Sequence, residues 1–221
     1  MSNEEFSNEF DILYNNISSN QAPGLDEYEK SVFLTNAQDS IILEMATGKN
    51  MIGESFEKTE ELRRYLTDIT KTATPIQSTK TTTKRISEKS TLYVCPEDLW
   101  FIVYESAKLK GVEGIVDVIP TTHDEYLRIR KNPFRKAADN KVLRLDIEGE
   151  LELVSSKEID EYTIRYIQCL EPIILEELEG LTIKGKSNKT ECKLNPALHE
   201  AILERAVKLA KASMGTLESG R

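Results

Sequence analysis

The sequence lacks the cysteine patterns of a disulfide-stabilised or zinc-binding protein. Its three cysteines, Cys95, Cys169 and Cys192, lie far apart and include no C-x-x-C pair. A disulfide framework in a secreted chain needs an even number of cysteines, and a zinc site usually draws its ligands from paired spacings. We therefore expect the three cysteines to serve as small apolar side chains in the interior.

Long apolar runs are missing as well. No segment approaches the ~18 apolar residues needed to cross a bilayer. The first ten residues, MSNEEFSNEF, are acidic and lack the basic start and apolar stretch of a signal peptide. The sequence predicts a soluble intracellular protein. With 221 residues, of which 39% are hydrophobic, it is long enough for one sizeable domain or two small ones.

Motifs of catalysis and cofactor binding are also absent. The chain contains no Walker-type G-x-x-x-x-G-K-[ST], no dinucleotide-type G-x-G-x-x-G and no G-x-S-x-G. Its two histidines, His123 and His199, have too few potential ligands around them for a zinc site. Neighbouring acids such as Glu176 and Glu177 point in different directions and do not form a catalytic pair. We expect a protein that is not an enzyme and that has no cofactor, metal or catalytic residue.

The net charge of −9 is spread unevenly along the chain. Residues 1–70 hold 14 acidic against 5 basic residues, whereas residues 71–90 hold 1 acidic against 5 basic residues. A protein that grips DNA over a broad surface normally has an excess of basic residues. The composition of the whole chain therefore argues against general DNA binding.

Residues 1–70 have the pattern of a helical bundle. Ser2 and Glu5 have the form of a capping box, and apolar residues follow at helical spacing up to Ile17. Asp26 and Glu29 provide a second helix start, and a third helix is expected over residues 55–69. Three helices with short connections make a small bundle.

The rest of the chain divides into three parts. Residues 71–90 are rich in Thr, Ser and Lys and are expected to form a polar arm or linker. Residues 91–190 form a β-rich insertion with one short helix, and a C-terminal helix in residues 191–221 starts at Asn195 and Pro196 and packs on the bundle or on a partner. The predicted fold class is α+β: an N-terminal helical bundle, a central antiparallel β insertion and a closing C-terminal helix. The expected strands are 92–94, 99–109, 115–119, 142–147, 151–154 and 162–168, and the expected short helix is 123–131.

Basic residues gather between Arg128 and Arg144. The segment contains seven basic residues and one acidic residue, Asp139. Three interpretations remain open: a solvated surface, a docking face for an acidic patch on a neighbouring subunit, or contact with DNA phosphates. A nucleic-acid-binding protein that uses residues 128–144 is thus the alternative function. Trp100, Phe101 and Tyr104 lie at strand spacing outside this segment, which favours core packing over base stacking.

Several long segments resemble virion structural proteins of crAss-like Bacteroides phages. The similar proteins form the first ring, or adaptor, below the portal. The resemblance spans nearly the full length of the chain. It rests on EFDILYNNISSNQAPGLDEYEKSVFLTNAQ (residues 9–38), GESFEKTEELRRYL (53–66), PEDLWFIVYES (96–106), DEYLRIRKNPFRK (124–136), VLRLD (142–146) and TECKLNPALHEAILERAVKLA (190–210).

The resemblance implies a structural head-to-tail adaptor in the neck of the virion, made in the cytoplasm of the bacterial host. Its partners would be its own copies in a dodecameric ring, the portal, downstream tail or collar rings, and genome DNA that passes through the lumen without sequence-specific binding. No membrane is implied. In related connectors a terminal helix, here residues 195–214, often reaches the portal. The candidate interface residues are Arg128, Arg130, Lys131, Arg135, Lys136, Leu198, Ile202 and Arg205.

Overall fold

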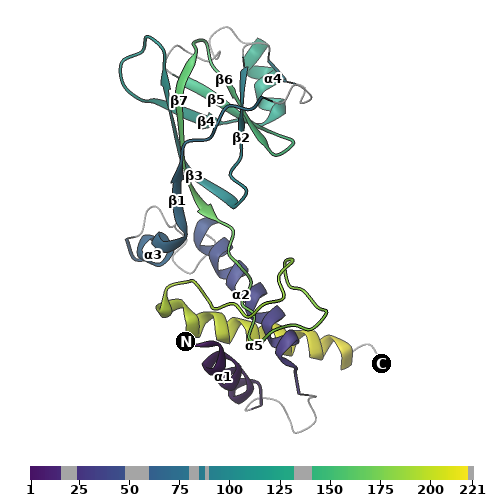
Figure 1. Cartoon of the computed structure of the whole chain (residues 1–221). Helices are drawn as coiled ribbons and strands as arrows, with labels where there is room; N and C mark the ends of the chain where they lie inside the picture. The colour runs from purple at the N-terminus through teal and green to yellow at the C-terminus, as the bar shows by residue number, and fades with distance from the viewer. Residues whose placement is uncertain (16–23, 48–59, 80–84, 88–89, 132–140, 219–221) are drawn as a thin grey trace. The chain divides into compact units, whose positions relative to one another are not determined.

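A computed structural model describes the chain except for residues 16–23, 48–59, 80–84, 88–89, 132–140 and 219–221. The chain divides into two compact units (Figure 1). Unit 1 contains Met1–Ile69 and Leu170–Arg221, and unit 2 contains Thr70–Cys169. Unit 2 is therefore an insertion within the sequence of unit 1.

Unit 1 is built from helices, which are α1 (Asn3–Asn15), α2 (Glu27–Thr47), α3 (Glu60–Leu66) and α5 (His199–Glu218). Helix α5 packs against both α1 and α2 (Figure 1). Phenylalanines from α1 and aliphatic residues from α2 and α5 form the buried surface between them. Since apolar residues recur every three or four positions, each helix turns one stripe toward the others.

The two helix starts predicted from capping boxes are both confirmed. The backbone N–H of Ser2 donates to Glu5 Oε2 at 2.7 Å, and Glu5 N–H donates to Ser2 Oγ at 3.2 Å. The same reciprocal bonds join Asp26 and Glu29, at 3.1 and 2.7 Å. Each pair satisfies two backbone donors that the helix itself leaves without acceptors.

The C-terminal helix also begins as its sequence predicts. Asn195 Oδ1 accepts from the N–H of Ala197 at 3.0 Å, and Pro196 opens a 3₁₀ turn, Pro196–Leu198, that leads into α5. Proline fits there because its missing N–H would have no helical acceptor. The predicted α+β fold class, with helices at both ends of the chain and strands between them, is confirmed.

The segment that follows unit 2 packs with the helices, although the sequence predicted residues up to 190 to belong to the β-rich part. Side chains from α1 and α2 bind much of its backbone, beside an isolated antiparallel bridge between Ile174 and Thr190. The N–H groups of Leu175 and Ile173 donate to Ser31 Oγ and Thr35 Oγ1 at 3.0 and 3.1 Å, and Asn3 Nδ2 donates to the carbonyl of Ile174 at 2.7 Å. Buried backbone groups need such partners, so these polar side chains hold the segment on the helices.

Unit 2 is a seven-stranded sheet in the order β1-β7-β3-β4-β5-β6-β2. Every pairing is antiparallel except β4 with β5, which are parallel and are connected through helix α4 (His123–Lys131). Parallel neighbours need a crossover connection of this kind. The strands are β1 (Thr70–Ala73), β2 (Ser90–Val94), β3 (Leu99–Leu109), β4 (Val116–Pro120), β5 (Lys141–Ile147), β6 (Glu150–Val154) and β7 (Ile159–Gln168).

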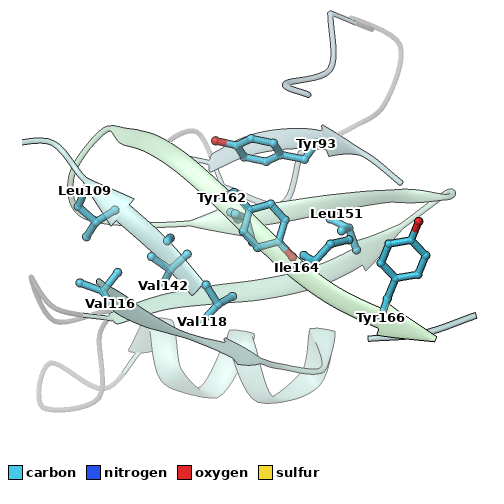
Figure 2. Packing of buried hydrophobic residues seen from close by; sticks show 11 residues of the cluster. Tyr93, Leu109, Val116, Val118, Val142, Leu151, Tyr162, Ile164 and Tyr166 are labelled. Carbon is cyan, nitrogen blue, oxygen red and sulfur yellow. The ribbon is translucent and has the colours of Figure 1, made fainter. Parts of the chain in front are cut away.

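One face of this sheet carries the main core of unit 2. Figure 2 shows Tyr162 and Ile164 of β7 among Val142 of β5 and Leu151 of β6. Each of these four side chains is at most 2% exposed. Because β-branched and aromatic side chains alternate inward along neighbouring strands, the sheet buries them on a shared face.

The cysteines only partly match the expected buried role. Cys95 and Cys192 are half-buried and Cys169 is exposed, and all three are free thiols. Burial raises the pKa of the Cys95 and Cys192 thiols. These two thiols therefore stay protonated at neutral pH, in keeping with an apolar role.

Two buried glutamates on β6 hold parts of the polar tract 71–90 onto the sheet. Glu152, fully buried, accepts hydrogen bonds from the N–H groups of Ile86 and Ser87 at 3.0 and 3.2 Å and from the Ser90 hydroxyl. Glu150, 3% exposed, accepts from the Ser78 hydroxyl. The described part of the polar tract is thus anchored within unit 2, and the sequence did not indicate this.

Candidate subunit-interaction surfaces

Helix α4 is fixed on the sheet of unit 2 by one buried face. Tyr126, 5% exposed, packs with Leu143, Leu145 and Val154 of β5 and β6. At the start of the helix, Thr122 Oγ1 accepts from the N–H of Glu125 at 3.2 Å. The cap and the buried tyrosine fix the orientation of the helix, so its outer side chains occupy defined positions.

Helix α4 carries the described basic residues that the sequence singled out. Arg128, Arg130 and Lys131 are all exposed, and Leu127 beside them is 45% exposed. None of the three basic side chains has an ion pair in the part of the chain that the structure describes. Arg135 and Lys136 lie outside the described residues.

Arg144 does not belong to this exposed basic surface. Its side chain is 12% exposed, and its Nε donates to Glu105 Oε2 at 3.0 Å. Glu105 also accepts from the hydroxyl of buried Tyr162, and a second guanidinium nitrogen binds Asp146. Burial raises the pKa of the Glu105 carboxyl, against the opposing effects of Tyr162 and Arg144. Arg144 therefore neutralises an internal carboxylate and is not available to a partner.

The three candidates near the C-terminal helix also have roles within unit 1. Leu198 and Ile202 are 5% and 0% exposed, because they form part of the apolar stripe that packs on the other helices. The Arg205 guanidinium lies 2.6 and 2.7 Å from the two carboxylate oxygens of Glu44, and it also donates to Ser40 Oγ at 3.1 Å. The structure thus brings Leu198 and Ile202 together in the core and pairs Arg205 with α2.

The first half of β3 presents aromatic side chains that the sequence placed in the core. In this half of β3 the register against β7 shifts between Leu99 and Phe101 and again between Ile102 and Tyr104. Such bulges interrupt the alternation of side chains along a strand. The rings of Trp100 and Phe101, although adjacent in sequence, stack with centroids 4.9 Å apart. Both are half-buried and Tyr104 is 53% exposed, so the prediction of core packing was wrong for Tyr104.

A hollow of about 480 Å³ lies beside these aromatics. Its walls are the first residues of β3 and the turn of the β5–β6 hairpin, residues 144–151. It lies beside the part of β3 that is not paired with β4, since β4 pairs with β3 at Ser106 and Ala107. Two adjacent aromatics in a strand were the available sequence signal for this surface.

An acidic loop of unit 1, in the segment that follows unit 2, lies against α2. Glu176, Glu177 and Glu179 are exposed and Leu181 is 47% exposed. Leu178 between them is buried with Ile174 and Ile183 against Tyr28 and Val32 of α2. The backbone of the loop is fixed as well, since the N–H of residue 178 donates to the carbonyl of residue 187 at 2.8 Å.

The described residues offer neither a candidate metal site nor a candidate membrane span. Within the described ranges, no group of three or more His, Cys, Asp or Glu side chains is placed to hold a metal ion. No described helix is both long and apolar enough to cross a membrane. The exposed side of α4, the hollow beside β3 and the acidic loop are therefore the candidate functional features of the described residues.

Comparison with known proteins identifies the family. The family described as phage tail ring protein 3/4 matches residues 1–221. This chain belongs to that family. It is 46% identical to Ring protein 3 of Bacteroides phage crAss001 over 231 aligned residues, which cover 100% of both chains. It is 35% identical to Ring protein 4/5 of the same phage over 224 residues, which cover 96% of this chain and 93% of the relative.

The resemblance to ring proteins of crAss-like phages that the sequence motifs indicated is thereby confirmed. The chain is a structural ring protein and a component of the virion. The match covers the helical unit and the inserted sheet alike, so both units are part of what the family shares.

Proposed function

We propose that this chain forms a closed ring in the head-to-tail connector of a crAss-like phage and that its role is structural, without enzymatic activity. The match of a phage tail ring family to all 221 residues is the observation that carries this proposal. In the proposed ring, dodecameric like the rings the sequence resemblance implied, each copy contacts two neighbours through different surfaces. Head-to-tail contacts of this kind close into a ring when the rotation between copies divides a full turn.

The proposed partners follow from the same relatives. The sequence motifs implied the ring directly below the portal. The numbers in the relatives' names, 3 and 4/5, support a later ring in the stack. We therefore propose that this ring contacts other ring proteins directly, is linked to the portal through them, and continues the channel through which the genome passes.

The charge of the chain supports a passive role toward DNA. With a net charge of −9, the ring as a whole repels phosphate, so a passing duplex would not be retained by general electrostatic attraction. This agrees with a channel that is continuous and does not bind the genome.

Electron cryomicroscopy of virion necks tests the proposed function. The expected result is a ring of this chain in the connector, with twelve copies around the tail axis and with other ring proteins above and below it. Co-expression with the portal and the other ring proteins of the same phage should give the same ring outside the virion. Virions that lack this chain, or a chain that stays monomeric when all of these partners are present, would refute the proposal.

A further inference from the structure

We propose that the outer face of α4 docks on the acidic loop of the next copy in the ring. This inference rests on the proposed ring assembly and specifies which surfaces meet. The basic face is defined here as Leu127, Arg128 and Lys131, and the acidic loop as residues 176–181. One surface belongs to unit 2 and the other to unit 1.

The spacing of the basic face brings its members together. Arg128 and Lys131 are three residues apart and Leu127 and Lys131 are four apart, so they are neighbours on one side of the helix. The opposite side holds Tyr126, which anchors the helix on the sheet. The result is an exposed leucine flanked by two cations that have no ion pair among the described residues.

The acidic loop has the matching composition. Its leucine, Leu181, is 47% exposed, and Glu176, Glu177 and Glu179 are exposed before it. None of the three carboxylates has an ion pair within the described ranges. By contrast, a nearby surface carboxylate, that of Glu171, binds both Lys186 and Lys193.

Both surfaces are held in place before they meet. The loop is fixed by the buried side chain of Leu178 and by its N–H, which donates to the carbonyl of Ser187 at 2.8 Å. Helix α4 is fixed by its cap and by Tyr126. Since the backbone of both surfaces is already fixed, little backbone entropy is lost when they meet.

The complementarity suits a ring in two ways. Opposite charges orient the two copies and oppose wrong registers, whereas like surfaces repel, so basic-to-basic pairing of two copies is disfavoured. The exposed leucines provide apolar area at the centre of the contact. Because the two surfaces differ, the contact leaves one of each surface free on every pair of copies, and only a closed ring occupies them all.

Contact of α4 with DNA phosphates is less well supported. Leu127 lies beside the cations and is 45% exposed. An exposed leucine gains nothing from a phosphate backbone, but it can pack on a leucine of a protein surface. We therefore infer that the basic face contacts the neighbouring copy and not DNA.

Charge reversal tests the pairing. One variant carries Arg128→Glu and Lys131→Glu, and another carries Glu176→Lys and Glu179→Lys. Each variant is co-expressed with the portal and the other ring proteins, and rings are counted by electron microscopy and mass photometry. Each reversal is expected to lower the fraction of subunits in rings by at least about tenfold, because it places like charges opposite each other.

Complementation makes the test specific. The two variants mixed in equal amounts should form rings again, since the acidic α4 of one faces the basic loop of the other and the native pair remains at the alternate contact. A single chain with all four substitutions should also form rings. Rescue of this kind cannot arise from a simple failure of the variants to fold.

Matched controls carry the same change of charge elsewhere in the same units. Lys108→Glu with Lys110→Glu changes exposed lysines of unit 2, and Glu191→Lys with Glu200→Lys changes exposed acids of unit 1. Both controls should retain rings. Rings that survive both test reversals, or reversals that are not rescued by mixing, would overturn the docking pair while leaving the ring proposal intact. Loss of rings in the wild type would refute the ring proposal itself.

DNA binding is measured on the same proteins. If Arg128→Glu with Lys131→Glu leaves rings intact but abolishes salt-sensitive binding to a fluorescent duplex, the basic face is a DNA contact and the docking proposal is wrong. If the docking proposal holds, wild-type and variant chains bind the duplex equally weakly.

Discussion

Removal of the Glu152 carboxylate should release the polar tract from the sheet of unit 2. Glu152 is fully buried and accepts from the N–H groups of Ile86 and Ser87 and from the Ser90 hydroxyl. Glu152→Ala removes an acceptor from all three donors at once. A hydrogen bond to a charged group contributes roughly 1.5–3 kcal/mol, and water reaches the half-buried N–H groups in part, so we expect a loss of about 2 to 4 kcal/mol in the free energy of unfolding.

Two assays measure this effect. Urea denaturation gives the free energy of unfolding. Limited trypsin digestion followed by mass spectrometry reports cleavage after the exposed Arg85, whose Nη1 donates to the carbonyl of Ser90. Cleavage there should accelerate in Glu152→Ala while the rest of unit 2 stays protected.

Two further variants calibrate the result. Glu152→Gln keeps one acceptor oxygen and should fall between the wild type and Glu152→Ala. Glu113→Ala removes an exposed carboxylate of the same unit and should change nothing measurable. Equal stability and equal cleavage of Glu152→Ala and wild type would show that the buried carboxylate does not hold the tract.

Two other predictions concern single side chains in each unit. Tyr162→Phe removes a hydroxyl that donates to buried Glu105 and should lower the free energy of unfolding by about 1–3 kcal/mol. The hydroxyl of Tyr166 donates to the more exposed Asp98 at 2.8 Å, so Tyr166→Phe should lower it by less. The reverse order in urea titrations would contradict this reasoning. The bonds from Lys186 and Lys193 lower the pKa of Glu171 from its ordinary value of 4.5 to about 2. The folded state therefore favours the carboxylate, so its contribution to stability is present above about pH 4.5 and is lost as the pH falls toward 2. Between these pH values, the Tm of Glu171→Gln should change less with pH than the Tm of the wild type. Equal pH dependence of the two Tm values would argue against the ion pairs.

Local chemistry at helix ends could be predicted from the sequence. The capping boxes at Ser2 and Asp26 and the Asn195-Pro196 start each place a helix where the structure has it, because their hydrogen bonds are formed between residues close in the sequence. The strands expected over residues 142–147 and 151–154 are likewise close in the sequence, and they pair as β5 and β6 across a turn in which Gly149 has a φ of 78°.

Features that depend on distant partners could not be predicted. Glu150 and Glu152 alternate with leucines on β6, which is the pattern of a strand with one solvated face. In the structure, however, Ser78 binds Glu150, and Ile86, Ser87 and Ser90 bind Glu152. The bulges that stack Trp100 on Phe101 come from the register of β3 against β7, which lies about 60 residues away in the chain. Neither signal is visible within a short window of sequence.

The candidate interface residues could likewise be predicted only in part. Exposure of Arg128 and Lys131 follows from the helical pattern of α4, which places both on the side away from buried Tyr126. The pattern did not show that Arg144, in the same basic segment, points to a buried carboxylate on another strand. For the C-terminal helix, the sequence left packing on the bundle and contact with a partner both open, and the structure buries Ile202 within unit 1.

The pairing of β1 with β7 has a consequence for how such proteins diversify. Thr70 lies opposite Ile167 in the sheet, so the chain enters and leaves unit 2 at adjacent positions. Because its two ends are neighbours, such an insert can be exchanged for another of different size without moving the two points of unit 1 to which it is joined. A phage could thus build several distinct rings from one helical frame by replacing the cassette that the frame carries.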